Sequence, residues 1–228
     1  MWLNNEQITD SAIRTYRKAL LRCGPSHVVI DNLFAHTKLD AVCDILQQDK
    51  GWQTQQHTYS ALYVDDIKWQ KTRKKQRFVQ RDVWQRPASG AGGNIAAEFL
   101  AFLRGEEFMS LLSRIFKVSL TDINVANPDI NSNYFRLGAA DFVNQHADDS
   151  LGREVCMLLY LNKDWQANHG GELVFTGTDD APVSIAPLYN RCVLFDPSSP
   201  GSEHWVKAVT TEHTQQYRYN VTSWYWSE

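Results

Sequence analysis

Residues 132–161, SNYFRLGAADFVNQHADDSLGREVCMLLYL, begin a series of short apolar runs that continues to the end of the sequence. Each run has the length of a strand, and turn-forming residues separate it from the next. Strands at this spacing are typical of a β sandwich or barrel. From about residue 118 onward, strands are expected at 132–137, 141–148, 154–161, 171–176, 183–186, 191–196, 204–209 and 217–226.

The first half of the chain mixes helical and strand patterns. HVVIDNLF at 27–34 is typical of a strand, and the glycine-rich ASGAGG at 88–93 predicts a flexible hinge. Apolar residues at helical spacing predict helices at 5–22, 37–47, 94–104 and 106–116. No internal repeat or low-complexity linker separates the two halves. We therefore expect a single domain over 1–228, α+β but mainly β, in which the helices of 1–117 buttress one face of a β core at 118–228.

Composition narrows the range of functions. A chain of 228 residues with 43% hydrophobic and 12% aromatic residues is long and apolar enough to fold around its own core. Its 23 basic and 26 acidic residues give a net charge of −3, so no nucleic-acid partner is expected. No run approaches the length needed to span a bilayer, and the four cysteines show no C-x-x-C pairing. These features predict a cytoplasmic protein without a membrane partner.

The stretch at 52–86 is unusual because two strand-like segments, 52–63 and 77–84, flank a strongly charged one. We interpret it as a long exposed hairpin or loop. Its basic run is more often a solvated surface than a binding site, but a mobile flap that recruits an acidic partner stays open. The run comprises Lys68, Lys71, Arg73, Lys74, Lys75 and Arg77.

A candidate metal site lies in DFVNQHAD at 141–148. In a strand, His146 and Asp148 are two residues apart and therefore share a face. A second histidine from a distant strand would complete a 2-His-1-carboxylate triad, which is typical of non-haem Fe(II) oxygenases. His204 is the candidate, because it follows a predicted strand and turn.

From Asn133 to Trp226 the sequence resembles the prolyl 4-hydroxylase-like Fe(II)/2-oxoglutarate dioxygenases. HVVIDNLF is similar to the entry strand of that family, so the resemblance covers roughly 27–228. The matching features, in order, are Tyr134, Gly138, His146 with Asp148, YLNKDW at 160–165, GGELVF at 170–175, Pro187, RCVLF at 191–195, His204 and YRYNVTSWYW at 217–226.

The resemblance implies a double-stranded β-helix, or jelly roll, and a site for 2-oxoglutarate. Arg218 is expected to grip the distal carboxylate of this cosubstrate, for which a planar guanidinium is well suited. By resemblance, Tyr160 hydrogen-bonds the same carboxylate, Thr222 adds a hydroxyl, Trp224 lines the pocket, and Tyr134 is the family's tyrosine upstream of H-x-D.

His213 is a rival third metal ligand within TTEHTQQ at 210–216, where the spacing to Arg218 predicts an extended turn. We discount it, because a residue so close to Arg218 would hardly reach the iron while the arginine grips the far end of the cosubstrate. The remaining histidines, His57 among them, are expected at caps, loops or turns.

The predicted reaction is the hydroxylation of an unactivated C–H bond, coupled to the decarboxylation of 2-oxoglutarate to succinate. Fe(II), 2-oxoglutarate and O2 are the implied cofactors and cosubstrates, with ascorbate as a candidate stimulant. A prolyl residue in a protein is the leading substrate by resemblance, followed by a free amino acid or another small molecule. A non-catalytic cupin-like binding protein and a zinc hydrolase are the rivals from other classes. Nothing in the sequence indicates the oligomeric state.

Overall fold

The computed structural model describes residues 1–48, 50–87, 94–123, 125, 127–210 and 216–227. Within these residues, the larger of two sheets contains β1 (His27–Asp31), β2 (Trp52–Thr58), β3 (Arg77–Trp84), β4 (Leu120–Thr121), β5 (Ser132–Leu137), β6 (Phe142–Val143), β7 (Arg153–Tyr160), β10 (Arg191–Phe195) and β12 (Arg218–Ser227). The main path runs β1-β10-β7-β12-β5-β3-β2, with β4 beside β12 and β6 beside β3. All of these pairings are antiparallel.

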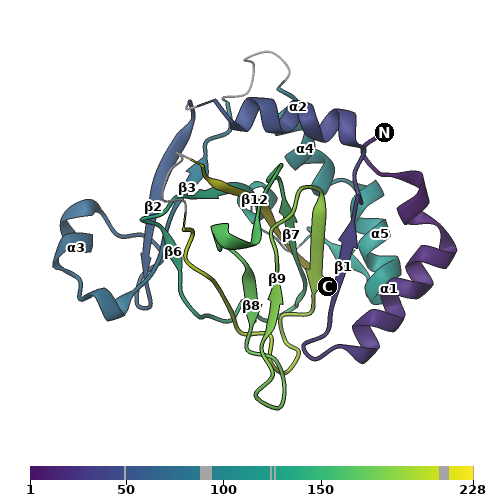
Figure 1. Cartoon of the computed structure of the whole chain (residues 1–228). Helices are drawn as coiled ribbons and strands as arrows, with labels where there is room; N and C mark the ends of the chain where they lie inside the picture. Colours follow the sequence, from purple (N-terminus) through teal and green to yellow (C-terminus); the bar gives the residue numbers. More distant parts are fainter. Residues whose placement is uncertain (49, 88–93, 124, 126, 211–215, 228) are drawn as a thin grey trace.

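A smaller antiparallel sheet lies across the larger one (Figure 1). It contains β8 (Leu173–Phe175), β9 (Val183–Ile185) and β11 (His204–Val206), in the order β11-β8-β9. Leu173 and Phe175 of β8 pack against Leu158 of β7 and Phe195 of β10. Two antiparallel sheets face to face, built from strands distant in sequence, form the expected jelly-roll core.

Four helices cover the other face of the large sheet, as the prediction of a helical buttress required (Figure 1). They are α1 (Asp10–Arg22), α2 (His36–Leu46), α4 (Ile95–Leu103) and α5 (Glu106–Phe116). Short 3-10 turns occur at η1 (Asn5–Ile8), η2 (Lys74–Gln76), η3 (Pro128–Asn131) and η4 (Ala167–His169). Local sequence signals define the helix ends: the side chain of Thr9 caps α1, that of Asn94 caps α4, and Lys117 ends α5 in the left-handed conformation.

The alternation of side chains along β7 explains how one sheet separates two cores. Val155, Met157 and Leu159 belong to the cluster that packs on the helices. Cys156 and Leu158 point the other way, toward the small sheet. Because both faces are buried, the strand is a continuous apolar run instead of an alternating one. The fold therefore has a helix-facing side and an inner side between the sheets.

The charged stretch between β2 and β3 belongs to a hairpin, as predicted, but it contains a helix that was not expected. It forms a hairpin arm with the short helix α3 (Asp66–Lys71) and then η2 near its outer end, at the far left of Figure 1. Trp69 anchors α3, since it is buried against Phe142 and beneath the guanidinium of Arg77. The aromatic anchor and the Asp65 cap outweigh the charge, so part of the run is helical.

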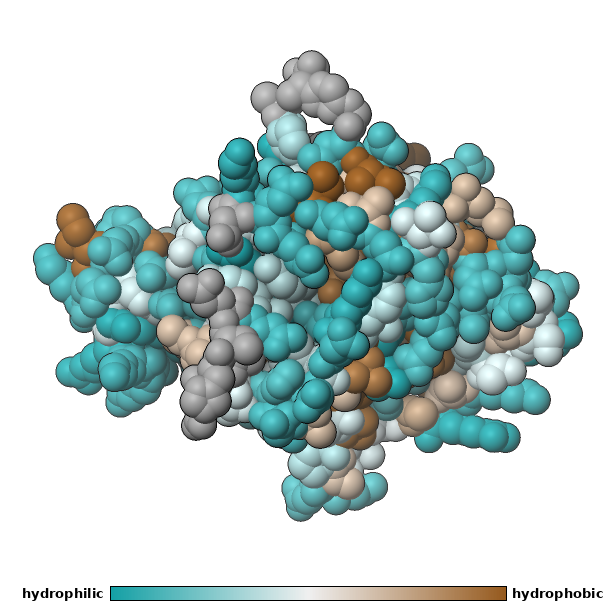
Figure 2. All heavy atoms as spheres, turned by 45° about the horizontal axis from the view of Figure 1, so that its top comes forward, coloured by the Kyte–Doolittle hydropathy of each residue, from teal (hydrophilic) through white to brown (hydrophobic). Residues whose placement is uncertain are grey.

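The surface of this arm is mixed in character. Figure 2 shows hydrophobic side chains at its outer end among hydrophilic ones. Leu62, Tyr63 and Ile67 are the large apolar residues exposed there.

Two further predictions concerned a strand at 141–148 and a hinge at 88–93. The strand expected at 141–148 is shorter, because only Phe142–Val143 is regular and His146 joins the small sheet by an isolated bridge. The proposed hinge at 88–93 lies outside the described residues. No helix in the described ranges is long and apolar enough to cross a bilayer.

Candidate active site

A cavity of about 690 Å³ lies between the inner face of the large sheet and the small sheet. Strands β2, β3, β5, β7, β8, β11 and β12 all contribute to its wall, and residues 58–63 of the arm lie at one side. The predicted residues that line it are His146, Asp148, His204, Arg218, Thr222 and Trp224.

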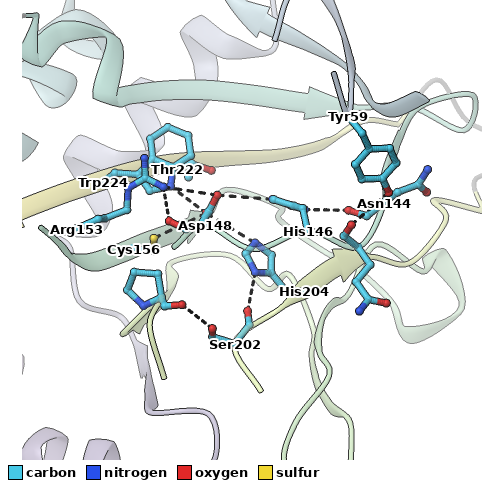
Figure 3. A network of polar contacts seen from close by, with 12 residues as sticks. Tyr59, Asn144, His146, Asp148, Arg153, Cys156, Ser202, His204, Thr222 and Trp224 are labelled. Atoms are coloured by element: carbon cyan, nitrogen blue, oxygen red, sulfur yellow. Dashed lines mark hydrogen bonds and ion pairs between the residues drawn. The ribbon is translucent and has the colours of Figure 1, made fainter. Parts of the chain in front are cut away.

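His146 and His204 meet because their backbones form an antiparallel bridge. The amide N of each donates to the carbonyl O of the other, at 3.0 Å from His146 and 2.9 Å from His204. The two imidazole rings are consequently only 4.4 Å apart between centroids. A contact between residues 58 positions apart is thus fixed by main-chain hydrogen bonds, and Figure 3 shows the two side chains close to each other.

Both imidazoles are oriented in the same way. Nδ1 of His146 lies 2.9 Å from the carbonyl O of Asn144, and Nδ1 of His204 lies 2.9 Å from the carbonyl O of Ser202. A carbonyl oxygen only accepts, so each Nδ1 carries the proton and donates it. Each Nε2 is then left with its lone pair, which is the arrangement that metal-binding histidines use.

Asp148 completes the cluster between the two rings (Figure 3). Its Oδ1 is 3.7 Å from Nε2 of His146, and its Oδ2 is 3.8 Å from Nε2 of His204. One ligand atom from each of the three residues lies within 4.8 Å of the others. The structure therefore brings together the three residues that the sequence pattern predicted.

Other side chains hold the carboxylate of Asp148 in position. Nε1 of Trp224 donates to Oδ2 at 2.9 Å, and the Cys156 thiol contacts the same oxygen at 3.7 Å. Arg153 donates to the backbone carbonyl of Asp148 and lies 4.0 Å from its Oδ1. The resemblance implied only that Trp224 lines the pocket, whereas its indole also orients a candidate metal ligand.

The protonation states of this cluster suit a cation. Burial alone would raise the pKa of Asp148, but His204, His146 and the Trp224 N–H more than offset this, so its pKa lies below the usual value. Burial, with His204 contributing in the same direction, lowers the pKa of His146 to about 4. One ionised carboxylate and a neutral imidazole are the forms that bind metal. Two imidazoles and one carboxylate form the donor set of the Fe(II) facial triad, so these residues fit the metal.

Arg218 is fixed deep in the same cavity. It is 1% exposed; its Nε donates to the carbonyl of Gly171 at 2.6 Å, and its Nη1 donates to Oδ1 of Asn220 at 2.7 Å. Nδ2 of Asn220 donates in turn to Oγ1 of Thr222 at 2.9 Å. Gly171 has φ +74, and a Cβ there would lie 3.0 Å from Cδ of Arg218. A residue without a side chain is needed for the arginine to pass.

Two buried polar atoms here have no partner among the described residues. They are Nη2 of Arg218 and the hydroxyl of Tyr160, whose ring lies 4.9 Å from Cζ of Arg218. Burial raises the pKa of Tyr160 to about 12, with Arg218 opposing the shift, so the hydroxyl remains protonated and can donate. Because buried donors are rarely left unpaired, a carboxylate between these two groups is the ligand that the arrangement fits.

The structure does not bring Tyr134 to the cavity, contrary to the prediction. Its side chain points from β5 to the helix-facing side, and its hydroxyl donates to the carbonyl of Ala96 at 2.8 Å. The neighbouring residues Asn133 and Phe135 line the cavity instead. The alternation along β5 places Tyr134 on the opposite face.

Sequence reasoning missed Arg81 of β3 and His57 of β2, which line the cavity but come from strands that carried no recognised motif. Arg153 of β7 lines the cavity as well. In the structure Arg153 packs on Trp224 and Trp226. The alternation along β3 offered one signal for Arg81, since the residue shares a face with the buried Val79 and Val83. His213, the discounted rival ligand, lies outside the described residues.

The comparisons with known proteins agree with this geometry. Residues 132–226 match the model of the 2OG-Fe(II) oxygenase superfamily. This segment is therefore similar to a superfamily whose cofactors are Fe(II), 2-oxoglutarate and O2. Prolyl hydroxylases are among its relatives.

One curated relative is prolyl 3-hydroxylase OGFOD1 from Mus musculus, which is 28% identical over 127 residues. That match covers 53% of this chain and 22% of the relative, so the chain spans about a fifth of that protein. A prolyl hydroxylase from Trichoplax adhaerens, solved with a peptide of hypoxia inducible factor, has a TM-score of 0.65 at 20% identity, with 98% and 94% of the two chains covered. A prolyl-4-hydroxylase from Pseudomonas putida has a TM-score of 0.63 at 15% identity, with 95% and 99% covered. At these identities, the two structures establish the shared fold.

Proposed function

We propose that this protein is an Fe(II)- and 2-oxoglutarate-dependent dioxygenase that hydroxylates an unactivated C–H bond, with a prolyl residue in a protein as the leading substrate. The iron would be held by His146, Asp148 and His204. Residues 1–228 would form a single domain. The four cysteines are unpaired, which favours a reducing, cytoplasmic location.

One observation carries the proposal: a guanidinium that is 1% exposed and lacks a partner for Nη2 shares a cavity with a His-Asp-His cluster. A buried cation that keeps a donor without a hydrogen-bond partner is costly. A dicarboxylate that reaches from the metal to Arg218 removes that cost and pairs the Tyr160 hydroxyl as well. Neither a metal nor a monocarboxylate alone accounts for both ends of the cavity.

Each residue then has a defined task. Arg218 and Tyr160 bind the distal carboxylate, and Asn220 and Gly171 orient the guanidinium. Trp224 positions the Asp148 carboxylate, while the backbone carbonyls of residues 144 and 202 keep both Nε2 atoms unprotonated. Bound iron with 2-oxoglutarate supplies the redox chemistry, in which O2 is consumed, one oxygen atom enters the C–H bond, and the other leaves in succinate with release of CO2.

A protein substrate is supported by the arm, because its exposed apolar residues Leu62 and Tyr63 line one side of the cavity. Tyr59 belongs to this arm and lines the cavity, with its hydroxyl donating to the carbonyl of Gln145 at 3.3 Å. A peptide bound along the arm would reach the candidate metal site directly. A free amino acid is the second candidate, because the same cavity is large enough for one beside the cosubstrate.

The experiment is a turnover assay with Fe(II), ascorbate and 2-oxoglutarate, in which succinate and substrate mass are both measured. Succinate formation is expected for the dioxygenase and is absent for a cupin-like binding protein or a zinc hydrolase. Proline-containing peptides in one arm and free L-proline in the other separate the two substrate classes by which one gains an oxygen atom. Hydrolysis of an added ester or peptide without succinate would instead establish the hydrolase.

A further inference from the structure

Arg81 is a second cation in the cavity. Neither metal binding by the His-Asp-His cluster nor cosubstrate binding by Arg218 involves it. It projects from the middle of β3 into the space that His146, Asp148 and Arg218 line. Its guanidinium lies over the ring of Phe135, with 3.4 Å between Cζ and the centroid. The stack fixes the plane of the guanidinium and leaves its edge free for hydrogen bonds.

Nε of Arg81 is buried and has no hydrogen-bond partner among the described residues. Nε2 of His57, on the adjacent strand β2, is buried and unpaired in the same way. Burial and the charge of Arg81 together lower the pKa of His57 to about 4, so this imidazole is neutral near pH 7. The wall formed by β2 and β3 therefore presents one cation and one neutral polar atom, both without a partner.

On the opposite face of the sheet, a buried arginine is paired with a carboxylate. Arg136 of β5 pairs with Asp82 of β3 at 2.9 Å, and its guanidinium stacks on Tyr217 and Trp52. Asp82 is the sequence neighbour of Arg81 but points to the other face, so it is not available to Arg81. Arg136 therefore pairs with a carboxylate of the protein itself, whereas Arg81 has no such partner among the described residues.

The carboxylates of the cavity are also too few to pair with Arg81. Asp148 is the one carboxylate among the described lining residues, and it is already shared by the two histidines and Arg153. The distal carboxylate of 2-oxoglutarate occupies Arg218. Burial lowers the pKa of Arg81 to about 10, and the nearby charge of Arg218 acts in the same direction while Asp148 opposes it. The guanidinium remains charged near pH 7 and requires an anion.

We propose that Arg81 binds a carboxylate of the substrate, with His57 beside it, so that the protein selects a substrate that carries a carboxylate close to the carbon to be hydroxylated. This inference rests on the proposed function, since it assumes that Arg218 is occupied by the cosubstrate. Two sources supply such a carboxylate: the α-carboxylate of a free amino acid, or an acidic side chain beside a prolyl residue in a peptide. Uncharged substrates of the same shape would leave the buried guanidinium unpaired and bind more weakly.

The test follows the Arg81 side chain itself by NMR of its Nε–Hε group, in protein loaded with Zn(II) and 2-oxoglutarate. Sodium acetate is the probe, and acetamide is the matched uncharged control. The resonance is assigned by its loss in Arg81→Lys. A saturable shift with acetate, at concentrations about tenfold or more below those at which acetamide acts, supports the proposal. No shift with acetate, or equal shifts with both probes, overturns it.

Two matched pairs then distinguish the sources of the carboxylate: L-proline against L-prolinamide, and the blocked dipeptide of proline and aspartate against that of proline and asparagine. A shift with L-proline alone assigns the free amino acid, and a shift with the aspartate dipeptide alone assigns the peptide.

Calorimetry of 2-oxoglutarate binding separates this inference from the proposed function. Arg81→Met is expected to weaken cosubstrate binding far less than Arg218→Ala does, and equal losses would place Arg81 in the cosubstrate site and overturn the inference. If the metal-loaded wild type fails to bind 2-oxoglutarate at all, the proposed function fails, while the acetate titration still reports on Arg81.

Discussion

The two faces of the large sheet differ in whether the hydroxyls of their buried tyrosines have hydrogen-bond partners. On the helix-facing side, the hydroxyl of Tyr134 donates to the carbonyl of Ala96 at 2.8 Å, and that of Tyr225 donates to the carbonyl of Leu103 at 3.0 Å. On the inner side, the hydroxyl of Tyr160 has no partner among the described residues. All three tyrosines are fully buried. Because folded proteins pair most buried polar atoms, the unpaired ones indicate the face that awaits ligands.

The period of two along each strand produces this division. Residue pairs such as Tyr134 and Phe135, or Asp82 and Arg81, are neighbours in sequence and lie on opposite faces of the sheet. One face stabilises the fold through complete packing and pairing, while the other keeps charges and donors for chemistry. Substitutions on the two faces should therefore have separable effects on stability and on ligand binding.

Asp148→Ala is expected to have the largest effect. It removes the only carboxylate among the described residues that line the cavity. Losing a residue that only hydrogen-bonds a metal ligand typically lowers metal affinity by about 10- to 100-fold, and losing the ligand itself should lower it further. Calorimetric titration with Mn(II) measures this, and succinate formation should cease. Because Asp148 lies in a loop outside the apolar clusters, thermal unfolding serves as the control. Metal binding of wild-type strength in the variant would remove Asp148 from the site.

Arg218→Ala should weaken 2-oxoglutarate binding while leaving metal affinity nearly intact, since Arg218 contacts the distal carboxylate. A lost charge-assisted bidentate contact in a buried site costs on the order of 2 to 4 kcal/mol. A large rise in the KM for 2-oxoglutarate is the readout. Arg114→Ala is the matched control, because Arg114 pairs with Asp10 on the helical surface at 2.7 Å. If both variants keep the wild-type KM, Arg218 does not bind the cosubstrate.

The tyrosine pair sharpens the comparison of the two faces. Tyr160→Phe removes a hydroxyl without a partner, so stability should hardly change, whereas affinity for 2-oxoglutarate should fall by about 0.5 to 1.5 kcal/mol. Tyr134→Phe removes a buried hydrogen bond to the Ala96 carbonyl and should cost about 0.5 to 1.5 kcal/mol of unfolding free energy without affecting cosubstrate affinity. Urea unfolding and calorimetry on both variants test this. The reverse pattern would show that the faces are assigned the wrong way round.

The smallest effect concerns an exposed ion pair at the edge strand. Hydrogen bonds from Arg191 to Asp31 lower the pKa of this carboxyl, although partial burial opposes the shift. A lowered folded-state pKa adds stability that is present above the usual value near 4 and is lost as the pH falls through the folded value. Since Asp31 is 54% exposed, the contribution should be below about 1 kcal/mol.

Wild type should therefore melt slightly above Asp31→Asn at pH 7, and the difference should vanish well below pH 4. A difference that persists unchanged in acid would indicate that the pair contributes nothing through its charge.

Much of the fold was predictable because strands buried on both faces leave long apolar runs. EVCMLLYL at 154–161 corresponds to β7, and RCVLF at 191–195 coincides with β10. The arm was predicted less well, since the helix α3 depends on the packing of Trp69 against Phe142, a tertiary contact that charge patterning does not reveal.

The candidate site was predictable where a motif spans few residues, and less so elsewhere. H-x-D at 146–148 led to His146 and Asp148, and the family resemblance led to Arg218, Thr222 and Trp224; all five line the cavity. Tyr134 was assigned from resemblance, and its face depends on the register of β5, which pairing with β12 determines. Arg81 and His57 enter the cavity only because β2 and β3 join the sheet edge, a long-range pairing without a local signal.

The most direct test of the central claim is an anaerobic titration of the Fe(II)-loaded protein with 2-oxoglutarate, followed by visible absorption. Chelation of the iron by the 2-oxo acid should produce a charge-transfer band that saturates with cosubstrate. The band should be absent in Asp148→Ala, and Arg218→Ala should require much more 2-oxoglutarate to reach saturation. A folded, Fe(II)-loaded wild-type protein that develops no band at saturating 2-oxoglutarate would contradict the account.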